Sequence, residues 1–281
     1  MENNDAFADP SGGRLKAGLS AAVDDNTGST PPLKSEETLD TLFGGKLQAF
    51  QSRSGYRFSI DAVLLAHFAT LKRGEQAIDL GTGNGVIPLL LAYLHPSVRI
   101  TGVEIQPAMV ERAQKNIRLN RCESRTQILP GDVRAIDRVA APASYDVVVC
   151  NPPYRKPVSG RISPNAEKQI ARHELKASLI DFLRAGAFLL RAKGRMGLVY
   201  PAVRCIDLLD TMRRVGVEPK CLRMVHSFAG REASLVLAEG VKGGRSGVKI
   251  LAPLVIYQQG KRYTVEVESM LAGARLKPPL D

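Results

Sequence analysis

The sequence lacks the features of membrane-spanning, secreted and metal-binding proteins. Its 281 residues contain no run of about eighteen apolar residues and no basic segment followed by an apolar one at the N-terminus, so we expect no membrane span and no signal peptide. The four cysteines form no C-x-x-C pair, and the four histidines show no metal-ligand spacing. We therefore expect reduced cysteines, no metal site and a cytoplasmic location.

Negative charge is scarce outside the N-terminal segment. The whole chain has a formal net charge of +11, but residues 1–37 hold three basic and seven acidic residues. The remainder holds 36 basic and 21 acidic residues, a net charge of +15. A domain this basic implies a polyanionic partner. Five basic residues lie close together in one stretch that would contact such a partner: Arg155, Lys156, Arg161, Lys168 and Arg172. The alternative interpretation of this stretch is a solvated charged loop.

Composition divides the chain into two parts. Residues 1–37 are rich in Gly, Ser, Asn, Asp and Pro and have little periodicity, which predicts a disordered tail. Residues 38–281 are long enough for one α/β domain with appendages. Within it, residues 59–71 have helical apolar spacing with Asp61 as a possible cap, and we expect this helix to close over a cofactor. The patterns further along predict helices at 175–190 and 203–215, strands at 196–200, 220–225 and 234–238, and a short terminal β extension at 252–257 and 263–267.

A glycine-rich turn follows an apolar strand at residues 76–85, which read Q-A-I-D-L-G-T-G-N-G. A mostly apolar helical pattern follows, so the segment predicts the first strand–turn–helix unit of a nucleotide-type α/β fold. The spacing G-x-G-x-G differs from the G-x-G-x-x-G of dinucleotide-binding proteins. Asp79, just before the turn, would repel a phosphate and favour a cation. S-adenosylmethionine (SAM) carries a sulfonium and an amino group and no phosphate, so it suits this turn.

Polar side chains end three further predicted strands. Glu104 lies about twenty residues beyond the glycines, where an acidic side chain can bind ribose hydroxyls. Asp132 ends the pattern at 126–133, and Asn151 follows the apolar run at 145–150. A single acidic residue at a strand end is common on a solvated rim. Four such ends in order are more specific, because ligands of open α/β sheets bind at the carboxyl ends of the strands.

The segment Asn151-Pro152-Pro153-Tyr154 forms the last of these strand ends. Proline fixes φ and has no N–H, so the turn is stiff and its carbonyl groups are free to accept hydrogen bonds. Neutral acceptors beside an aromatic face suit methylation of a planar amine or amide nitrogen. The alternative interpretation is an ordinary proline turn at the end of a strand.

Taken together, these motifs resemble the class I SAM-dependent methyltransferases of the Asn-Pro-Pro-Tyr type. The resemblance is closer still to the bacterial adenine-N6 methyltransferases that modify valine tRNA. It also rests on G-Y-R-F-S-I-D-A-V-L-L at 55–65, G-V-E-I-Q-P at 102–107 and I-A-R-H-E at 170–174, and it extends from about Thr38 to the end. The resemblance implies a Rossmann-like, seven-stranded sheet with helices on both faces.

The resemblance also implies an activity: methyl transfer from SAM to the exocyclic N6 of an unpaired adenine next to the anticodon of valine tRNA. The partner would be the anticodon loop, contacted by the five basic residues named above. The implied catalytic residues are Asn151, Pro152 and Tyr154. The implied cofactor-binding residues are Phe58, Asp79, Gly81, Thr82, Gly83, Asn84, Gly85, Glu104, Ile105, Asp132, Val133 and Asn151.

Three other functions fit the same motifs. Protein glutamine N5-methyltransferases acting on release factors share the Asn-Pro-Pro-Tyr turn, but they carry an N-terminal helical domain that this sequence lacks, and they do not explain the basic excess. Ribosomal-RNA guanine-N2 methyltransferases act on a similar amine, although those relatives usually have Phe in place of Tyr154. A non-catalytic module that binds SAM or RNA is a different class, against which the intact set of Asp79, Glu104 and Asn151 argues.

Overall fold

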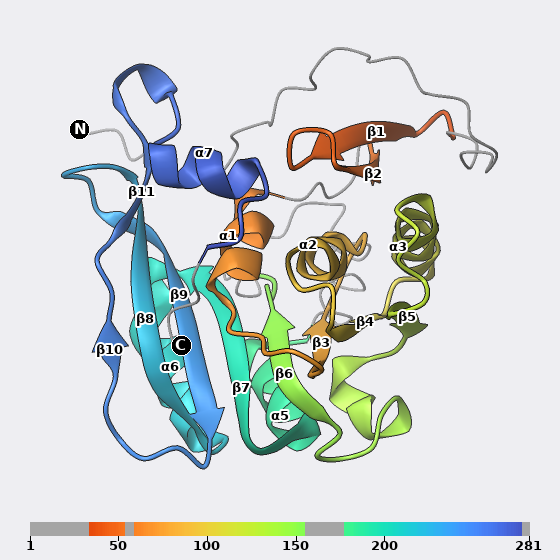
Figure 1. Ribbon diagram of the computed structural model, residues 1–281. Helices are drawn as coiled ribbons and strands as arrows, with labels where there is room; N and C mark the ends of the chain where they lie inside the picture. Colours follow the sequence, from red (N-terminus) through yellow and green to blue (C-terminus); the bar gives the residue numbers. More distant parts are fainter. Residues whose placement is uncertain (1–33, 54–58, 155–176, 277–281) are drawn as a thin grey trace, which may run out of the picture.

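The structure, a computed structural model, describes residues 34–53, 59–154 and 177–276. A nine-stranded sheet forms its centre, in the order β10-β8-β9-β7-β6-β3-β4-β5, with β11 also paired to β8 (Figure 1). The predicted α/β class with a seven-stranded sheet is confirmed by strands β3 to β9, to which β10 and β11 add short strands at one edge. In chain order these nine strands are β3 (Gln76–Leu80), β4 (Arg99–Glu104), β5 (Thr126–Pro130), β6 (Tyr145–Cys150), β7 (Leu190–Pro201), β8 (Val217–Phe228), β9 (Ala233–Lys242), β10 (Lys249–Ile250) and β11 (Leu254–Tyr257).

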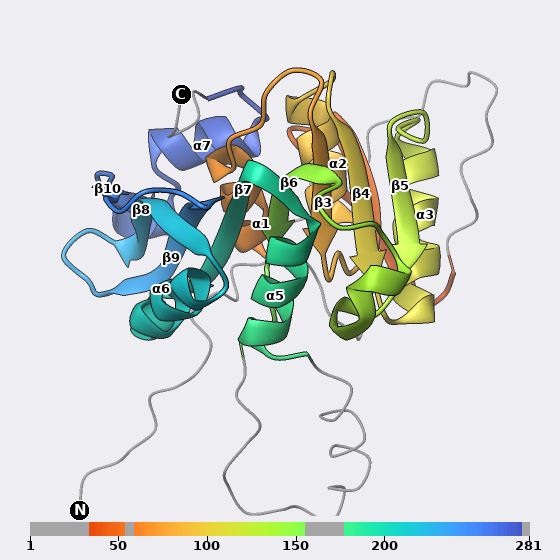
Figure 2. The same ribbon diagram turned by 90° about the horizontal axis from the view of Figure 1, so that it is seen from below.

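Helices cover both faces of the sheet. One face carries α1 (Ile60–Phe68), α2 (Val86–Leu94) and α3 (Pro107–Leu119), and the other carries α5 (Leu179–Leu189) and α6 (Cys205–Arg214) (Figures 1 and 2). Strand β6 shows why most of its sequence is apolar. Val147 and Val149 pack into the core beneath α1 and α2, whereas Val148 and Cys150 pack into the core beneath α5. Successive side chains of a strand point to opposite faces, so a strand covered on both faces is apolar through its centre. The polar residue of β6, Asp146, lies near its start.

The predicted helix at 59–71 corresponds to α1, and it is a core element. All nine of its residues are buried. The helix is mostly apolar, which is typical of a helix surrounded by other elements, and α1 packs against α2, β7 and α7 (Val265–Leu271). Only its N-terminal end approaches the carboxyl ends of the strands. That this end covers a cofactor stays a prediction.

A β-hairpin before α1 was absent from the prediction. Strands β1 (Glu37–Leu42) and β2 (Leu47–Ser52) pair antiparallel around Gly44 and Gly45, both at positive φ. The expected tail included residue 37, but Glu37 is the first residue of β1 and is 2% exposed. Its carboxylate pairs with Lys115 at 2.8 Å and Arg112 at 3.1 Å on α3, so this residue belongs to the folded part. Residues 1–33 of the expected tail lie outside the described residues.

Two asparagines, one within α3 and one at its C-cap, attach the hairpin to the domain. The side chain of Asn116 accepts a hydrogen bond from Phe50 N–H at 2.7 Å and donates to Phe50 O at 3.1 Å. It also lies 2.9 Å from the carbonyl oxygen of Asn84 in the glycine turn. Asn120 pairs with the backbone of Gln48 in the same manner, at 3.0 and 2.7 Å, but is partly exposed. A side-chain amide thus mimics a neighbouring strand for β2, which satisfies backbone groups that would otherwise be buried without partners.

The C-terminal segment departs from its prediction in one half. The expected strand at 252–257 is confirmed as β11, which lies parallel to β8. The expected strand at 263–267 is wrong: Tyr263 makes a single antiparallel bridge with Tyr257, and α7 begins two residues later. The physical reason is a helix cap, because the Thr264 hydroxyl accepts a hydrogen bond from Val267 N–H and acidic residues fill the first turn.

The remaining described elements are short 3-10 helices: η1 (Val133–Arg138), which is kinked at Ala135, η2 (Ala202–Arg204) and η3 (Gln259–Lys261). Within the described ranges, no helix has the length and apolar character needed to cross a membrane.

We expect Asn116→Ala to lower the free energy of unfolding by about 2–4 kcal/mol, because it leaves buried backbone groups of Phe50 and Asn84 without partners. Asn120→Ala is the matched control on the same helix and should cost about 1 kcal/mol, since water can reach its partners. Urea unfolding followed by circular dichroism measures both. Equal losses in the two variants would contradict the role given to the buried amide.

Candidate functional site

Four parallel strands end side by side at one edge of the sheet. Leu80 of β3 pairs with Cys150 of β6 on one side and with Val103 of β4 on the other, and Glu104 pairs with Pro130 of β5. The segments that follow these strands are therefore neighbours. They carry most of the predicted site: Asp79, the turn of Gly81, Thr82, Gly83, Asn84 and Gly85, then Glu104 and Ile105, Asp132 and Val133, and Asn151, Pro152 and Tyr154.

Glu104 holds the glycine turn in place. One carboxylate oxygen accepts a hydrogen bond from Gly83 N–H at 2.9 Å, and the other accepts one from Gln106 N–H at 2.9 Å. The N–H groups of Gly81 and Thr82 both donate to the carbonyl of Val103, at 2.8 and 2.9 Å. An ionised carboxylate can accept about four hydrogen bonds, so Glu104 retains capacity for ligand hydroxyls.

Glycine is required at two positions of the turn for different reasons. Gly85 has φ of +79°, and a Cβ there would lie 2.9 Å from the Cβ of Ala113 on α3. Helix α2 therefore begins pressed against α3. Gly83 has φ of +57°, but no heavy atom lies within 4 Å of the position its Cβ would occupy. Its open side leaves room for a ligand to approach the backbone.

Asp79 is a buried acid with unsatisfied oxygens. The residue is 0% exposed, and neither carboxylate oxygen has a hydrogen-bond partner among the described residues. Burial, together with a smaller effect of the Glu104 charge, raises the pKa of Asp79 to about 7. The nearby Thr82 hydroxyl acts in the opposite direction and lowers that pKa, but it makes no hydrogen bond of good geometry with the carboxylate. A buried acid left in this state suits a ligand with positive charge, so these residues fit SAM.

The acidic residue that follows β5, Asp132, is already paired with a neighbouring residue. The Asp132 carboxylate caps η1 by accepting the N–H of Arg134 at 2.9 Å, and it pairs with the guanidinium of the same residue at 2.6 Å. This hydrogen bonding to Arg134 lowers the pKa of Asp132. Val133 is buried, whereas Ile105, directly after Glu104, is 38% exposed. An exposed apolar side chain beside an acid offers a face to a ligand ring.

The Asn-Pro-Pro-Tyr turn folds back on itself. The hydroxyl oxygen of Tyr154 lies 2.5 Å from Asn151 Oδ1 and 3.0 Å from Asp61 Oδ2. The Tyr154 ring meets Tyr200 edge-on, with centroids 5.8 Å apart and planes at 88°. Pro152 is buried, while Asn151 and Tyr154 are half-buried. The aromatic ring and the amide are therefore held by each other and by two other elements, α1 and β7.

Two residues at this turn were missed from the sequence. Asp61 was expected only as a helix cap, yet its carboxylate reaches Tyr154. The sequence did contain an indication of a functional role for Asp61, because this residue lies in the motif segment at 55–65. Tyr200 ends β7, the strand next to β6, and burial raises the pKa of its hydroxyl. The Arg204 guanidinium lies 5.0 Å from the centroid of the Tyr200 ring.

Six predicted site residues lie outside the described residues. They are Phe58, expected at the cofactor, and the basic residues Arg155, Lys156, Arg161, Lys168 and Arg172, expected at RNA. Their roles stay predictions. A separate expectation from the sequence was that the protein has no metal site. The described ranges hold no cluster of three or more His, Cys, Asp or Glu residues suited to a metal ion.

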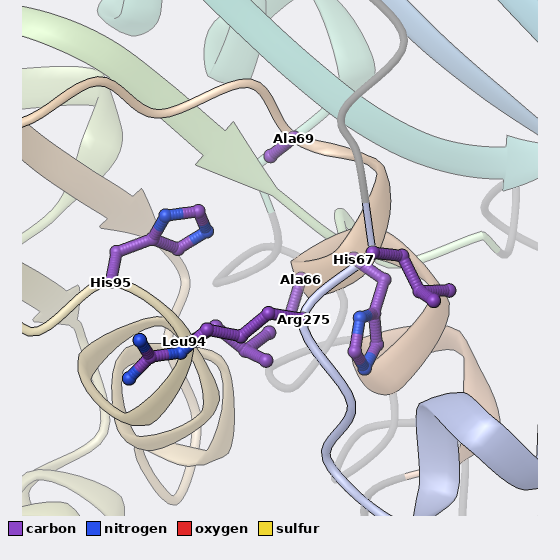
Figure 3. Close-up of a pocket in the computed structure, with 7 residues that line it drawn as sticks. Ala66, His67, Ala69, Leu94, His95 and Arg275 are labelled. Carbon is purple, nitrogen blue, oxygen red and sulfur yellow. The ribbon is translucent and has the colours of Figure 1, made fainter.

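A separate hollow lies at the other end of α1. It is lined by Ala66, His67, Ala69, Leu94, His95, Arg275 and Leu276 (Figure 3). Burial lowers the pKa of both histidines. The hollow lies where α1 and α2 end, whereas Asp61 and Gly85 mark the starts of the same helices. It is therefore distinct from the strand-end site.

Comparison with curated proteins finds relatives over most of the chain. A protein of Porphyromonas gingivalis (strain ATCC BAA-308 / W83) is 32% identical over 199 residues, covering 67% of this chain and 76% of the relative. A protein of Tolumonas auensis is 31% identical over 190 residues, covering 66% and 77%. A protein of Haemophilus influenzae (strain PittGG) is 28% identical over 226 residues, covering 76% and 89%. Each is named tRNA1(Val) (adenine(37)-N6)-methyltransferase.

Solved structures share the fold. A predicted O-methyltransferase from Agrobacterium tumefaciens superposes with a TM-score of 0.63 at 21% identity, covering 76% of this chain and 96% of its own. TYW2 from P. horikoshii, in complex with MeSAdo, superposes with a TM-score of 0.52 at 15% identity, covering 75% and 73%.

A family model, Methyltransferase small domain, matches residues 59–201. The matched region begins at the cap of α1 and ends with β7, so it contains Asp61, the glycine turn, all four strand ends and Tyr200. It spans half of the chain, and the Porphyromonas and Tolumonas relatives are matched over three quarters of their own length. The chain therefore belongs to the methyltransferase small domain family.

Proposed function

We propose that this protein transfers a methyl group from SAM to the N6 of an unpaired adenine in tRNA. The observation that carries the proposal is the Asn-Pro-Pro-Tyr turn at the end of β6, next in the sheet to Asp79 and the glycine turn on β3. The names of the three relatives support valine tRNA as the substrate and adenine 37, in the anticodon loop, as the target.

Each strand end has a distinct part in holding the cofactor. SAM supplies a methyl group on a positively charged sulfur, which a nucleophile takes by direct displacement. The Asp79 carboxylate pairs with the positive charge of the methionine portion, and the turn at 81–85 brings backbone groups close to that portion. Glu104 accepts the ribose hydroxyls, and Asp132 with Val133 and Ile105 borders the adenine. We also assign Phe58, which lies outside the described residues, to the cofactor.

The Asn151 amide and the Pro152 carbonyl orient the attacking nitrogen. The lone pair of adenine's amino group is delocalised into the ring, which makes the nitrogen a poor nucleophile. Two acceptors that take its two hydrogens fix its orientation and favour a lone pair directed at the methyl group. Positioning of this kind supplies several kcal/mol, and complementarity to the developing charge adds to it. No strong base is needed, because the nitrogen becomes acidic only as it gains the methyl group.

Tyr154 and the basic residues select the form of the substrate. An aromatic ring stacked on a base contributes roughly 1–3 kcal/mol. A paired base cannot reach such a site, so the target is unpaired or flipped out of its stack. The excess of basic residues, a net +15 beyond residue 37, suits the phosphates of an RNA loop, and the five basic residues at 155–172 lie next to the turn in the chain. In this proposal residues 38–281, together with Glu37, are the methyltransferase domain, and residues 1–33 are a tail.

The choice of acceptor is tested by offering several acceptors in parallel reactions. Labelled methyl SAM is incubated with unmodified tRNA and, separately, with translation release factors and ribosomal RNA, and each product is digested and identified. Label in N6-methyladenosine of tRNA supports the proposal. Label in glutamine or in N2-methylguanosine moves the assignment to one of the two other enzymes, and label in none of them makes a binding module the next candidate.

We expect Asn151→Ala to reduce methyl transfer to tRNA at least about a hundredfold, because the amide that orients the amino group is gone. SAM affinity, measured by calorimetry, should change little. A large loss of SAM affinity would show that Asn151 serves the cofactor instead.

We expect Asp79→Asn to weaken SAM binding and to stabilise the free protein. A carboxyl group with a raised folded-state pKa adds stability below its ordinary pKa, and that stability is lost as the pH rises through about 7. Asn does not ionise, so the variant should melt higher than the wild type at pH 8, by a larger margin than at pH 5. SAM affinity of the wild type should fall as the pH drops below about 7, and that of the variant should not follow it.

Glu239 supplies a matched control. It is also 0% exposed, and burial raises its pKa to about 7. It accepts Thr70 N–H at 2.7 Å, beyond the C-terminal end of α1. Glu239→Gln should show the same pH-dependent stabilisation and retain SAM binding. Unchanged SAM affinity in Asp79→Asn, or equal loss in the two variants, would contradict a role for Asp79 at the cofactor.

A further inference from the structure

The Tyr154 hydroxyl faces two acceptors with a single hydrogen. Its oxygen lies 2.5 Å from the amide oxygen of Asn151 and 3.0 Å from a carboxylate oxygen of Asp61. A phenol donates one hydrogen bond, and its hydrogen rotates about the C–O bond to suit its surroundings. The hydrogen can therefore serve either acceptor without movement of the ring.

The two acceptors, Asn151 and Asp61, have different roles in the proposed reaction. The amide oxygen of Asn151 is the group that receives a hydrogen of the target amine. A hydroxyl hydrogen directed at that oxygen competes with the amine for it. Hydrogen bonds to an ionised carboxylate are roughly twice as strong as those between neutral groups. Asp61 is therefore the better acceptor for Tyr154 once an amine reaches Asn151.

The fold fixes Asp61 in place for this purpose. It is the second residue of α1, is 2% exposed, and lies in the first helical turn, where backbone N–H groups favour negative charge. The whole of α1 is buried, so the carboxylate is carried by a rigid element. Asp61 and Tyr154 are 93 residues apart in the sequence, and α1 packs beside β7, the strand next to β6.

We infer that Asp61 is a positioning residue of the methyl transfer: it accepts the Tyr154 hydroxyl, orients the ring for stacking, and leaves the Asn151 amide oxygen to the target amine. The inference rests on the proposed function. It concerns the target side of the site and not the cofactor, so a loss of Asp61 lowers kcat while the KM for SAM stays constant.

Steady-state kinetics with tRNA test the coupling of the two side chains. We expect Asp61→Ala to lower kcat about tenfold. Asp61→Asn, which keeps an acceptor oxygen without the charge, should fall between that variant and the wild type. Tyr154→Phe keeps the ring and loses the hydroxyl. In its background Asp61→Ala should have no further effect, because the interaction that Asp61 makes is already absent.

A spectroscopic measurement tests the contact without relying on turnover. In protein labelled with ¹³C at the tyrosine ring, the resonance lost in Tyr154→Phe is that of Tyr154. This resonance should shift in Asp61→Ala and stay unchanged in Glu239→Gln, the buried acid beyond the other end of α1. If the wild type methylates no substrate but the resonance shifts, the proposed function fails while the contact stands.

Three results would overturn the inference. The Tyr154 resonance would not respond to Asp61→Ala, or the losses in kcat would multiply in the double variant, or the loss would appear only in the KM for SAM. Thermal unfolding of each variant identifies a loss that comes from instability. Asp61→Asn and Tyr154→Phe conserve side-chain shape, so they still decide the question if Asp61→Ala does not fold.

Discussion

Parallel strands covered on both faces have only their ends available for polar chemistry, and this constraint organises the whole molecule. Strand β6 packs alternate side chains into two separate cores. The same sheet places the ends of β6, β3, β4 and β5 in one row. The polar groups that the strands carry to this edge therefore lie near one another, although they come from distant parts of the sequence. The activity that we propose for the Asn-Pro-Pro-Tyr turn depends on that row, because alone it is only a stiff turn.

Three acidic residues lie at this row of strand ends, and they differ in how the loss of solvation of their carboxylates is compensated. Glu104 accepts two backbone N–H groups, which return much of the solvation lost on burial. Asp132 is matched by Arg134 on the rim. Asp79 receives neither kind of support, so its pKa rises to about 7. Among these three acids, Asp79 is the one whose burial costs stability that a bound cation would restore, and binding sites commonly depart from the most stable arrangement in this manner.

The sequence predicted the sheet and the strand-end residues well, because both depend on local patterns. Apolar runs that end in an acid or in Asn-Pro-Pro identify buried strands and their carboxyl ends without any knowledge of contacts. The contact of Asp61 with Tyr154 joins residues 93 apart, and nothing in either segment specifies it. The hairpin at 37–52 was missed for another reason: its apolar positions are few, and its backbone is completed by side-chain amides of α3. At 263–267 β-branched residues suggested a strand, but the Thr264 side chain caps a helix that begins at Val265.

The glycine turn is fixed from two sides by different elements. Glu104 binds the N–H of Gly83 from β4, and Asn116 binds the carbonyl of Asn84 from α3. The same Asn116 amide pairs with the backbone of Phe50 in β2. One buried side chain therefore joins the hairpin to the turn that we assign to the cofactor. The hairpin lies outside the region that the family model matches, yet it is attached to the site through a hydrogen-bonded side chain. A change in how the hairpin packs on α3 would consequently reach the cofactor turn directly, which makes the hairpin part of the site's support.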